Sequence, residues 1–351
     1  MFAYDKHLTD KELAILEDLC TFRALTTEMI QHRHFEKKGN YVNVLLSQLR
    51  KEGYIRSSIL SKSRKGRKGF AYHQISETGK ECLIRHGVSV EGQWKNIYLS
   101  DYQIPNLLLA NEVLLEYESL GWQVWDSRQT KSAYGLDYRN NIQGMLFSPN
   151  GERYGLYALE TRITENVVGR IQSEIRKHTQ IENWIVLAKG MDSYNLFIEY
   201  GFENDNEEKR HLPQQKRLLT IGKLVIEPFK INFEKRKAFS TEEQWIQRLC
   251  AYYGFKIKTT DIEENRRQSF PIIIEHQGEE MYFVDLTDAD LNKYNDVIIY
   301  NESLSSRQWE RRKVVVVTLQ IENKANLKLD ELQIVDHLLL DTEEFKQLCT
   351  K

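Results

Sequence analysis

The N-terminal residues place apolar side chains at the three- and four-residue spacing of amphipathic helices. This spacing predicts helices over 9–20, 26–34 and 41–52. The first helix begins with Thr9-Asp10-Lys11-Glu12, the residue pattern of a capping box. The third helix ends at Gly53, and glycine readily adopts the left-handed conformation of a helix C-cap. The buried side of the third helix is expected to hold Val44, Leu45 and Leu49, with Val42 as a further candidate.

Two alternating segments, Tyr54–Leu60 and Phe70–Ile75, predict a pair of strands after the third helix. The loop between them, residues 61–69, contains five positive charges, two glycines and no acid. A further helix is expected from Ser76. Three helices, a basic hairpin and a helix are the element order of a winged helix-turn-helix domain. The phrases LRKEGYI and YHQISETGKECL resemble that superfamily.

The side chains of the third helix and the basic loop have the chemistry that duplex DNA requires. A helix fits the major groove, where Asn and Gln pair with adenine and Arg pairs with guanine, while loop cations bind phosphates or a neighbouring minor groove. A winged helix that contacts protein, with a solvated basic loop, is the alternative. The predicted DNA-binding residues are Asn40, Tyr41, Asn43, Ser47, Gln48, Arg50 and Lys51 in the helix, and Lys62, Arg64, Lys65, Arg67 and Lys68 in the loop.

The distribution of charge favours the same end of the chain. The net charge is only −2, but residues 1–87 contain 16 Lys and Arg against 10 Asp and Glu, a balance of +6, and the remainder has a balance of −8. Because duplex DNA is a dense line of negative charge, the basic N-terminal module is the part expected to face it.

Length and composition narrow the class of protein. A chain of 351 residues predicts two or three domains, and 41% hydrophobic with 28% charged residues is ordinary globular composition. The sequence has no apolar run long enough to span a membrane and no signal-peptide pattern, so we expect a cytoplasmic protein without a membrane partner. The four widely spaced cysteines predict neither a zinc site nor a disulfide framework. Cofactor and nucleophile motifs are absent, so no cofactor is expected.

The middle region predicts an α/β unit in the order helix, three strands, helix, strand. The hairpin turn is Ser148-Pro149-Asn150-Gly151, where Asn-Gly is a strong hairpin signal. The predicted helices cover 106–120 and 165–179, and the strands cover 122–125, 142–147, 154–159 and 184–188, with an irregular polar stretch after the first strand.

This order resembles the restriction-endonuclease-like nucleases, in which an Asp and the Glu of an E-x-K motif hold a metal. Gln143-Gly144 stands where the resemblance places Asp-Gly, and Glu160-Thr161-Arg162 stands where it places Glu-x-Lys. Mg²⁺ prefers carboxylate oxygens, so the loss of one acid weakens the site. The resemblance therefore implies an inactive scaffold without a metal, with Glu160 and Asp137 as the remaining catalytic candidates.

The C-terminal third repeats the pattern. A strand is predicted at 224–229, a linker at 230–237 and a new helix behind the capping-box spelling Ser240-Thr241-Glu242-Glu243. Further strands are predicted at 255–259, 271–275, 281–286, 297–300 and 314–317, in a divergent second copy of the middle fold. Asp285, Asp288 and Asp290 form either a cation site or an N-cap region. His32-x-His34 is a formal metal-ligand spacing, or a helix-end feature.

An N-terminal winged helix joined to a degraded nuclease-like domain resembles the replication-relaxation family of plasmids and other mobile elements. The resemblance covers residues 5–230 and includes the phrases NNIQGMLFSPNGERYGLYALETRITEN and NWIVLAK. The expected fold class is α+β, with a winged helix over 1–95, a nuclease-like domain over 102–235 and an α/β domain over 238–351. The family implies a non-enzymatic, sequence-specific binder of double-stranded DNA in replication, relaxosome function or transcription regulation. Its expected partners are further copies of the chain or other plasmid replication proteins. The alternative is a Mg²⁺-dependent nuclease or nickase.

Overall fold

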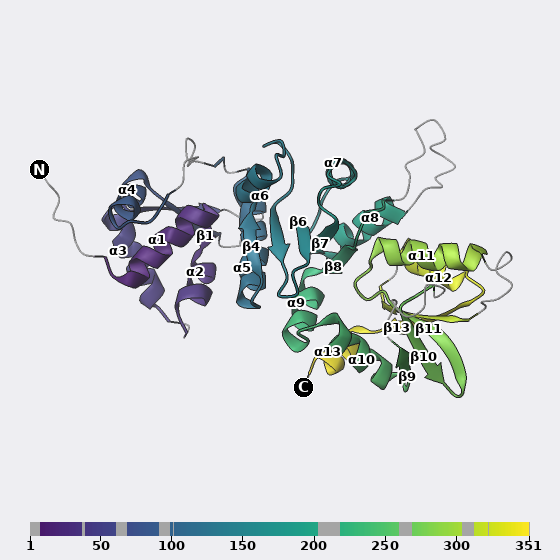
Figure 1. The fold of residues 1–351 in the computed structure, drawn as a ribbon. Helices are drawn as coiled ribbons and strands as arrows, with labels where there is room; N and C mark the ends of the chain where they lie inside the picture. Colours follow the sequence, from purple (N-terminus) through teal and green to yellow (C-terminus); the bar gives the residue numbers. More distant parts are fainter. Residues whose placement is uncertain are drawn as a thin grey trace, which may run out of the picture. The chain divides into compact units, whose positions relative to one another are not determined.

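The chain has a mixed α+β fold, as the sequence predicts. The computed structural model describes residues 8–36, 39–60, 69–90, 99–100, 102–202, 218–259, 269–303, 312–321 and 323–350 (Figure 1). Two compact units divide the chain, residues 1–119 with 124–129, and residues 120–123 with 130–351. The domain boundaries expected from the sequence stay predictions. None of the helices in the described ranges combines the length and apolar character needed to cross a bilayer.

The first unit packs helices against a small antiparallel sheet. The strands lie in the order β1-β3-β2. Strand β1 is two residues long, too short for an alternating pattern to predict it, and its second residue, Thr26, also caps the next helix. The elements are α1 (Asp10–Phe22), β1 (Leu25–Thr26), α2 (Thr27–His34), α3 (Tyr41–Lys51), β2 (Ile55–Leu60), β3 (Phe70–Ile75), α4 (Glu77–Arg85) and α5 (Ile104–Ser119).

Local signals at the helix ends of this unit act as the sequence predicts. The Thr9 hydroxyl accepts from the Glu12 N–H, and the Glu12 carboxylate accepts from the Thr9 N–H, which is a capping box. Gly53 follows α3 with φ of +82°, the left-handed conformation that an L side chain rarely adopts. The Asn111 amide on α5 donates to the carbonyls of Phe22 and Ala24, which fixes the turn between α1 and β1.

The chain beyond α5 forms two five-stranded sheets, and all their strands except β4 lie in the second unit (Figure 1). Strand β4 (Gln123–Asp126) and helix α6 (Ser127–Ala133) are divided between the units, so the irregular stretch predicted after β4 is partly helical. The middle sheet has the order β4-β5-β6-β7-β8. Its other elements are β5 (Gly144–Phe147), β6 (Arg153–Leu159), α7 (Glu165–Lys177), β7 (Asn183–Ala188), α8 (Met191–Phe202), β8 (Leu224–Pro228) and α9 (Phe229–Ala238).

The C-terminal sheet has the order β9-β10-β11-β12-β13. Its hydrophobic core lies under α10 and α13 and includes the buried Trp245 and Phe345, whose rings meet edge to face at 5.7 Å. The elements are α10 (Glu242–Tyr252), β9 (Lys256–Thr259), β10 (Ile272–His276), β11 (Glu279–Asp285), α11 (Leu291–Glu302), β12 (Val314–Leu319), α12 (Lys324–Asp330), β13 (Val335–Leu340) and α13 (Thr342–Cys349).

The two sheets share one topology. Strands β5 and β6 are antiparallel, and β6, β7 and β8 are parallel to one another. Strands β10 and β11 are likewise antiparallel, and β11, β12 and β13 are parallel. Helices α7, α8 and α9 follow β6, β7 and β8, just as α11, α12 and α13 follow β11, β12 and β13. The shared topology is what we expect if the C-terminal region is a divergent second copy of the middle fold.

Three predictions in the second unit are wrong. Val297–Tyr300 is not a strand but part of α11, because Tyr294, Val297 and Ile298 are buried at helical spacing while Ile299 is 48% exposed. The expected linker 230–237 is helix α9, which buries Phe233. The helix behind Ser240 is capped one residue later than predicted, by the Thr241 hydroxyl, which accepts from the Gln244 N–H at 3.3 Å.

Candidate nucleic-acid interface

Helix α3 has a buried side that fixes it and an outer side that faces solvent. The buried side packs against the rest of the first unit and consists of Val42, Leu45, Leu46 and Leu49. The prediction that Val44 is buried is wrong, since its side chain is 60% exposed. Of the predicted DNA-binding residues, Asn40, Tyr41, Asn43, Arg50 and Lys51 are exposed, and Ser47 and Gln48 are half-buried.

The outer side of α3 combines amide, hydroxyl, cationic and apolar groups. Helix α3 contains no acid from Tyr41 to Lys51. Tyr41 is 63% exposed and lies three residues before Val44, which in turn lies four residues before Gln48. That spacing places the three side chains on one helical face. The same spacing, read in the sequence, would have identified Val44 as an outward residue.

A buried polar contact ties the strands of the first unit to α2. The His73 ring on β3 lies between the Thr27 hydroxyl, 2.9 Å from Nε2, and the Ser57 hydroxyl, 2.8 Å from Nδ1. Burial lowers the pKa of His73 to about 4, and the positive charge of Arg50 adds to the shift. The ring is therefore neutral at physiological pH.

The His32-x-His34 pair is a helix-end feature. The His34 Nε2 atom lies 2.6 Å from the Asp18 carboxylate on α1. The same carboxylate lies 2.6 Å from the Arg33 guanidinium, which also pairs with Glu118 on α5. His32 is exposed. These contacts fix the end of α2, and no cluster of three metal-ligating side chains occurs in the described part of the chain.

The basic loop is anchored by the hairpin formed by β2 and β3. These strands pair antiparallel from Ile55 with Ile75 to Leu60 with Phe70. A Cβ atom on Gly69 would lie 2.5 Å from the Leu60 carbonyl oxygen, so the hairpin end requires glycine there. The predicted loop cations Lys62, Arg64, Lys65, Arg67 and Lys68 lie outside the described residues.

Gln143, Asp137 and Glu160, the positions that the nuclease resemblance singles out, each have different hydrogen-bond partners. The Gln143 side chain pairs with the backbone of Ala158, donating to its carbonyl at 3.1 Å and accepting from its N–H. Asp137 is exposed and accepts from the Arg139 N–H at 2.8 Å. Glu160 is half-buried, and its carbonyl accepts from the Ser193 hydroxyl at 2.6 Å. Gln143 thus holds the backbone of β6 by hydrogen bonds at the position where the nuclease resemblance expects a metal-binding acid.

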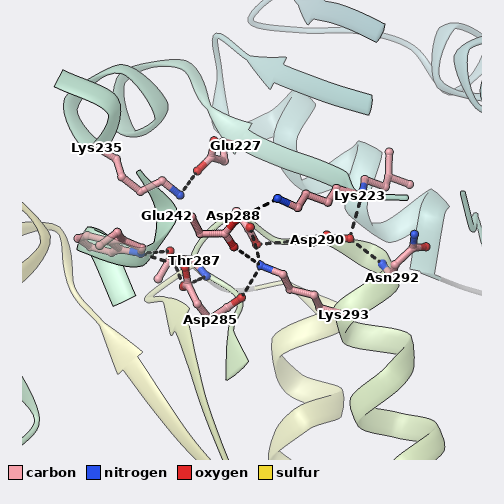
Figure 2. Close-up of polar contacts among 12 residues, drawn as sticks. Lys223, Glu227, Lys235, Glu242, Asp285, Thr287, Asp288, Asp290, Asn292 and Lys293 are labelled. Carbon is pink, nitrogen blue, oxygen red and sulfur yellow. Dashed lines mark hydrogen bonds and ion pairs between the residues drawn. The ribbon is translucent and has the colours of Figure 1, made fainter. Parts of the chain in front are cut away.

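The acidic cluster after β11 forms a junction between the two sheets of the second unit (Figure 2). The Asp290 carboxylate caps α11 by accepting from the Asn292 N–H at 2.9 Å, and also accepts from the Leu224 N–H of β8 at 3.2 Å. The Asp288 carbonyl accepts from the Ile226 N–H of β8 at 2.9 Å. Asp285 accepts from the Trp245 indole N–H at 2.9 Å. The contacts support the N-cap interpretation.

Ion pairs of alternating sign extend this junction (Figure 2). The Glu242 carboxylate lies between the Lys223 ammonium at 3.1 Å and the Lys293 ammonium at 3.2 Å. Lys293 also lies 2.9 Å from the Asp288 carboxylate. Lys293 lowers the pKa of Glu242 well below its ordinary value. Burial alone would lower the pKa of Lys293, but Asp288 and Glu242 raise it, so the network holds its charges at neutral pH.

Comparisons with known proteins leave the family open. No family model matches the sequence, no curated protein matches it, and no solved structure matches its fold. The resemblance to the replication-relaxation family therefore stays a prediction.

Proposed function

We propose that the chain is a sequence-specific binder of double-stranded DNA, and that the outer side of α3 enters the major groove. The observation that carries the proposal is the outer side of α3, which has no acid from Tyr41 to Lys51 and presents Asn43 and Gln48 on the same helix as the exposed Arg50 and Lys51. The Gln48 amide donates to the carboxylate of Glu52, just after the helix, at 3.2 Å, a contact that it would exchange for a base. Amide side chains recognise adenine through two hydrogen bonds, and Arg50 has the same capacity for guanine. The helix order and the antiparallel hairpin after α3 support the proposal, since a winged helix-turn-helix domain has elements in this order.

The basic loop 61–69 supplies the phosphate contacts in this proposal. It leaves from the end of the β2–β3 hairpin, the position of a wing, and contains five cations. Phosphate contacts fix position and raise affinity, while the α3 amides select the sequence. The family resemblance extends the proposal to a mobile element, with a role in replication, in the relaxosome or in transcription regulation. The second unit then serves assembly with partners.

Selection of bound sites from a random duplex library tests the proposal. The purified chain should enrich one motif, and Asn43→Ala or Gln48→Ala should relax the preference at single positions by about 1–3 kcal/mol each. Arg50→Ala should weaken binding, whereas Arg85→Ala, which removes an arginine that is also exposed, from α4, is the matched control. Failure to enrich any motif would contradict the proposal. Nicking of supercoiled DNA with Mg²⁺ that is lost in Glu160→Ala would establish the nuclease alternative.

A further inference from the structure

The outer edge of β8 is closed by the chain itself. The N–H groups of Leu224 and Ile226 point away from β7 and donate to Asp290 and Asp288. The next outward position is Pro228, which has no N–H group to satisfy. Exposed strand edges are templates for pairing with another chain, and proteins cover or interrupt them. The edge of the middle sheet is therefore protected at each outward donor.

Strand β13 occupies the same place in the C-terminal sheet, and its register can be matched to that of β8. The Val314 N–H of β12 donates to the Ile334 carbonyl at 3.0 Å, just as the Trp184 N–H of β7 donates to the Lys223 carbonyl at 2.8 Å. Ile334 thus corresponds to Lys223. It follows that Val335, His337 and Leu339 of β13 correspond to Leu224, Ile226 and Pro228 of β8.

The outward N–H groups of β13, unlike those of β8, have no hydrogen-bond acceptor in the described part of the chain. Within the described ranges, no hydrogen bond engages the N–H or C=O of Val335, His337 or Leu339. Leu339 stands where the other sheet has proline, and its side chain is 47% exposed. The strand contains no Lys, Arg or Pro, and its one acid, the exposed Asp336, lies 4.0 Å from the Lys313 ammonium just before β12. By contrast, β9 at the opposite edge of this sheet is four residues long and carries Lys256 and Lys258.

We propose that a second copy of this chain pairs with β13, in an antiparallel arrangement across a two-fold axis at His337. This register brings Val335 of one copy opposite Leu339 of the other, and Asp336 opposite Leu338. A shift that centres the axis on Asp336 would oppose two carboxylates, which is unfavourable. The charge pattern of the strand is thus compatible with its own antiparallel copy, and the pair extends the sheet to ten strands.

The test uses the full chain with Leu339→Pro, which gives β13 the proline that β8 already has. The substitution removes the outward N–H but leaves the bonds to β12, which use the residues of even number from Ile334 to Leu340. Sedimentation velocity over a concentration series should show a dimer for the parent chain. The dissociation constant should rise at least about tenfold in Leu339→Pro.

Two further variants keep the result interpretable. Leu339→Thr retains the N–H and should preserve the dimer, and Ile299→Lys changes a similarly exposed apolar side chain on α11 and should also preserve it. If Leu339→Pro loses its native circular dichroism, Leu339→Lys replaces it as a charged edge residue. A parent chain that stays monomeric would overturn the proposal. So would a dimer that neither edge substitution weakens.

Discussion

Val44 places a branched apolar side chain on a helical face of amides and cations. On the proposed function, this side chain contacts a thymine methyl group in the major groove. Replacing the contacted thymine by uracil in the selected site should weaken binding about fourfold, the effect of about 0.8 kcal/mol for one methyl group. Fluorescence anisotropy measures the change. Val44→Ala should bind both DNAs equally, and a parent chain that does not distinguish them would exclude this contact.

His73 predicts an acid-sensitive first unit. Its pKa is about 4 in the folded chain and lies near 6.5 when unfolded, so the unfolded state binds the proton more tightly. The stabilisation is complete above pH 6.5 and is lost as the pH falls towards 4, by about 3 kcal/mol. Hydrogen exchange of the β3 amides, corrected for intrinsic rates, should accelerate over that window. In His73→Gln the dependence should flatten, and an unchanged profile would assign the acid sensitivity to another group.

At the scale of elements, the segment after β11 accepts hydrogen bonds from the outer edge of β8 and also caps the start of α11. Asp290→Ala removes both contacts and leaves the buried Leu224 N–H without an acceptor. We expect the free energy of unfolding to fall by about 2–4 kcal/mol, from the lost cap and the unsatisfied donor. Denaturant unfolding measures it.

Asp290→Asn is the matched control for this element, because its amide oxygen keeps both hydrogen bonds. Burial raises the pKa of Asp290 to about 6, so the folded chain pays for the charged carboxylate at higher pH. The asparagine variant should therefore be nearly as stable as the parent at pH 7. Equal destabilisation by alanine and asparagine would show that the negative charge, rather than the acceptor, holds the junction.

Elements with local signals could be predicted from the sequence. The Asn150-Gly151 turn is one, since Gly151 has φ of +87° and the Ser148 N–H donates to the Glu152 carbonyl as in a tight hairpin. The misassigned segments depend on tertiary contacts. Val297–Tyr300 consists of β-branched and aromatic residues, which favour strands, but its helix is fixed by packing of Tyr294 and by the cap at Asp290 seven residues earlier. Val44 is a different case, because the buried Val42, Leu45, Leu46 and Leu49 recur at helical spacing and this pattern alone leaves Val44 on the outer side.

At the scale of the whole molecule, a small basic module precedes an acidic unit with two sheets of one topology. Charged groups that the sequence offers as a metal site serve instead to join those sheets. The outer residue types of α3 could be read from the sequence because they depend on positions along one helix. The junction could not, because it depends on β8 meeting the segment after β11, more than sixty residues later in the chain.

The salt dependence of DNA affinity tests the central claim most directly. For the full chain on its selected site, the logarithm of the binding constant should fall steeply and linearly with the logarithm of salt concentration. Replacing Arg64, Lys65, Arg67 and Lys68 together by alanine should make the slope shallower by up to about 3–4, as four phosphate contacts are lost. A chain without measurable affinity for duplex DNA at low salt, or with a slope that the four substitutions leave unchanged, would contradict the account.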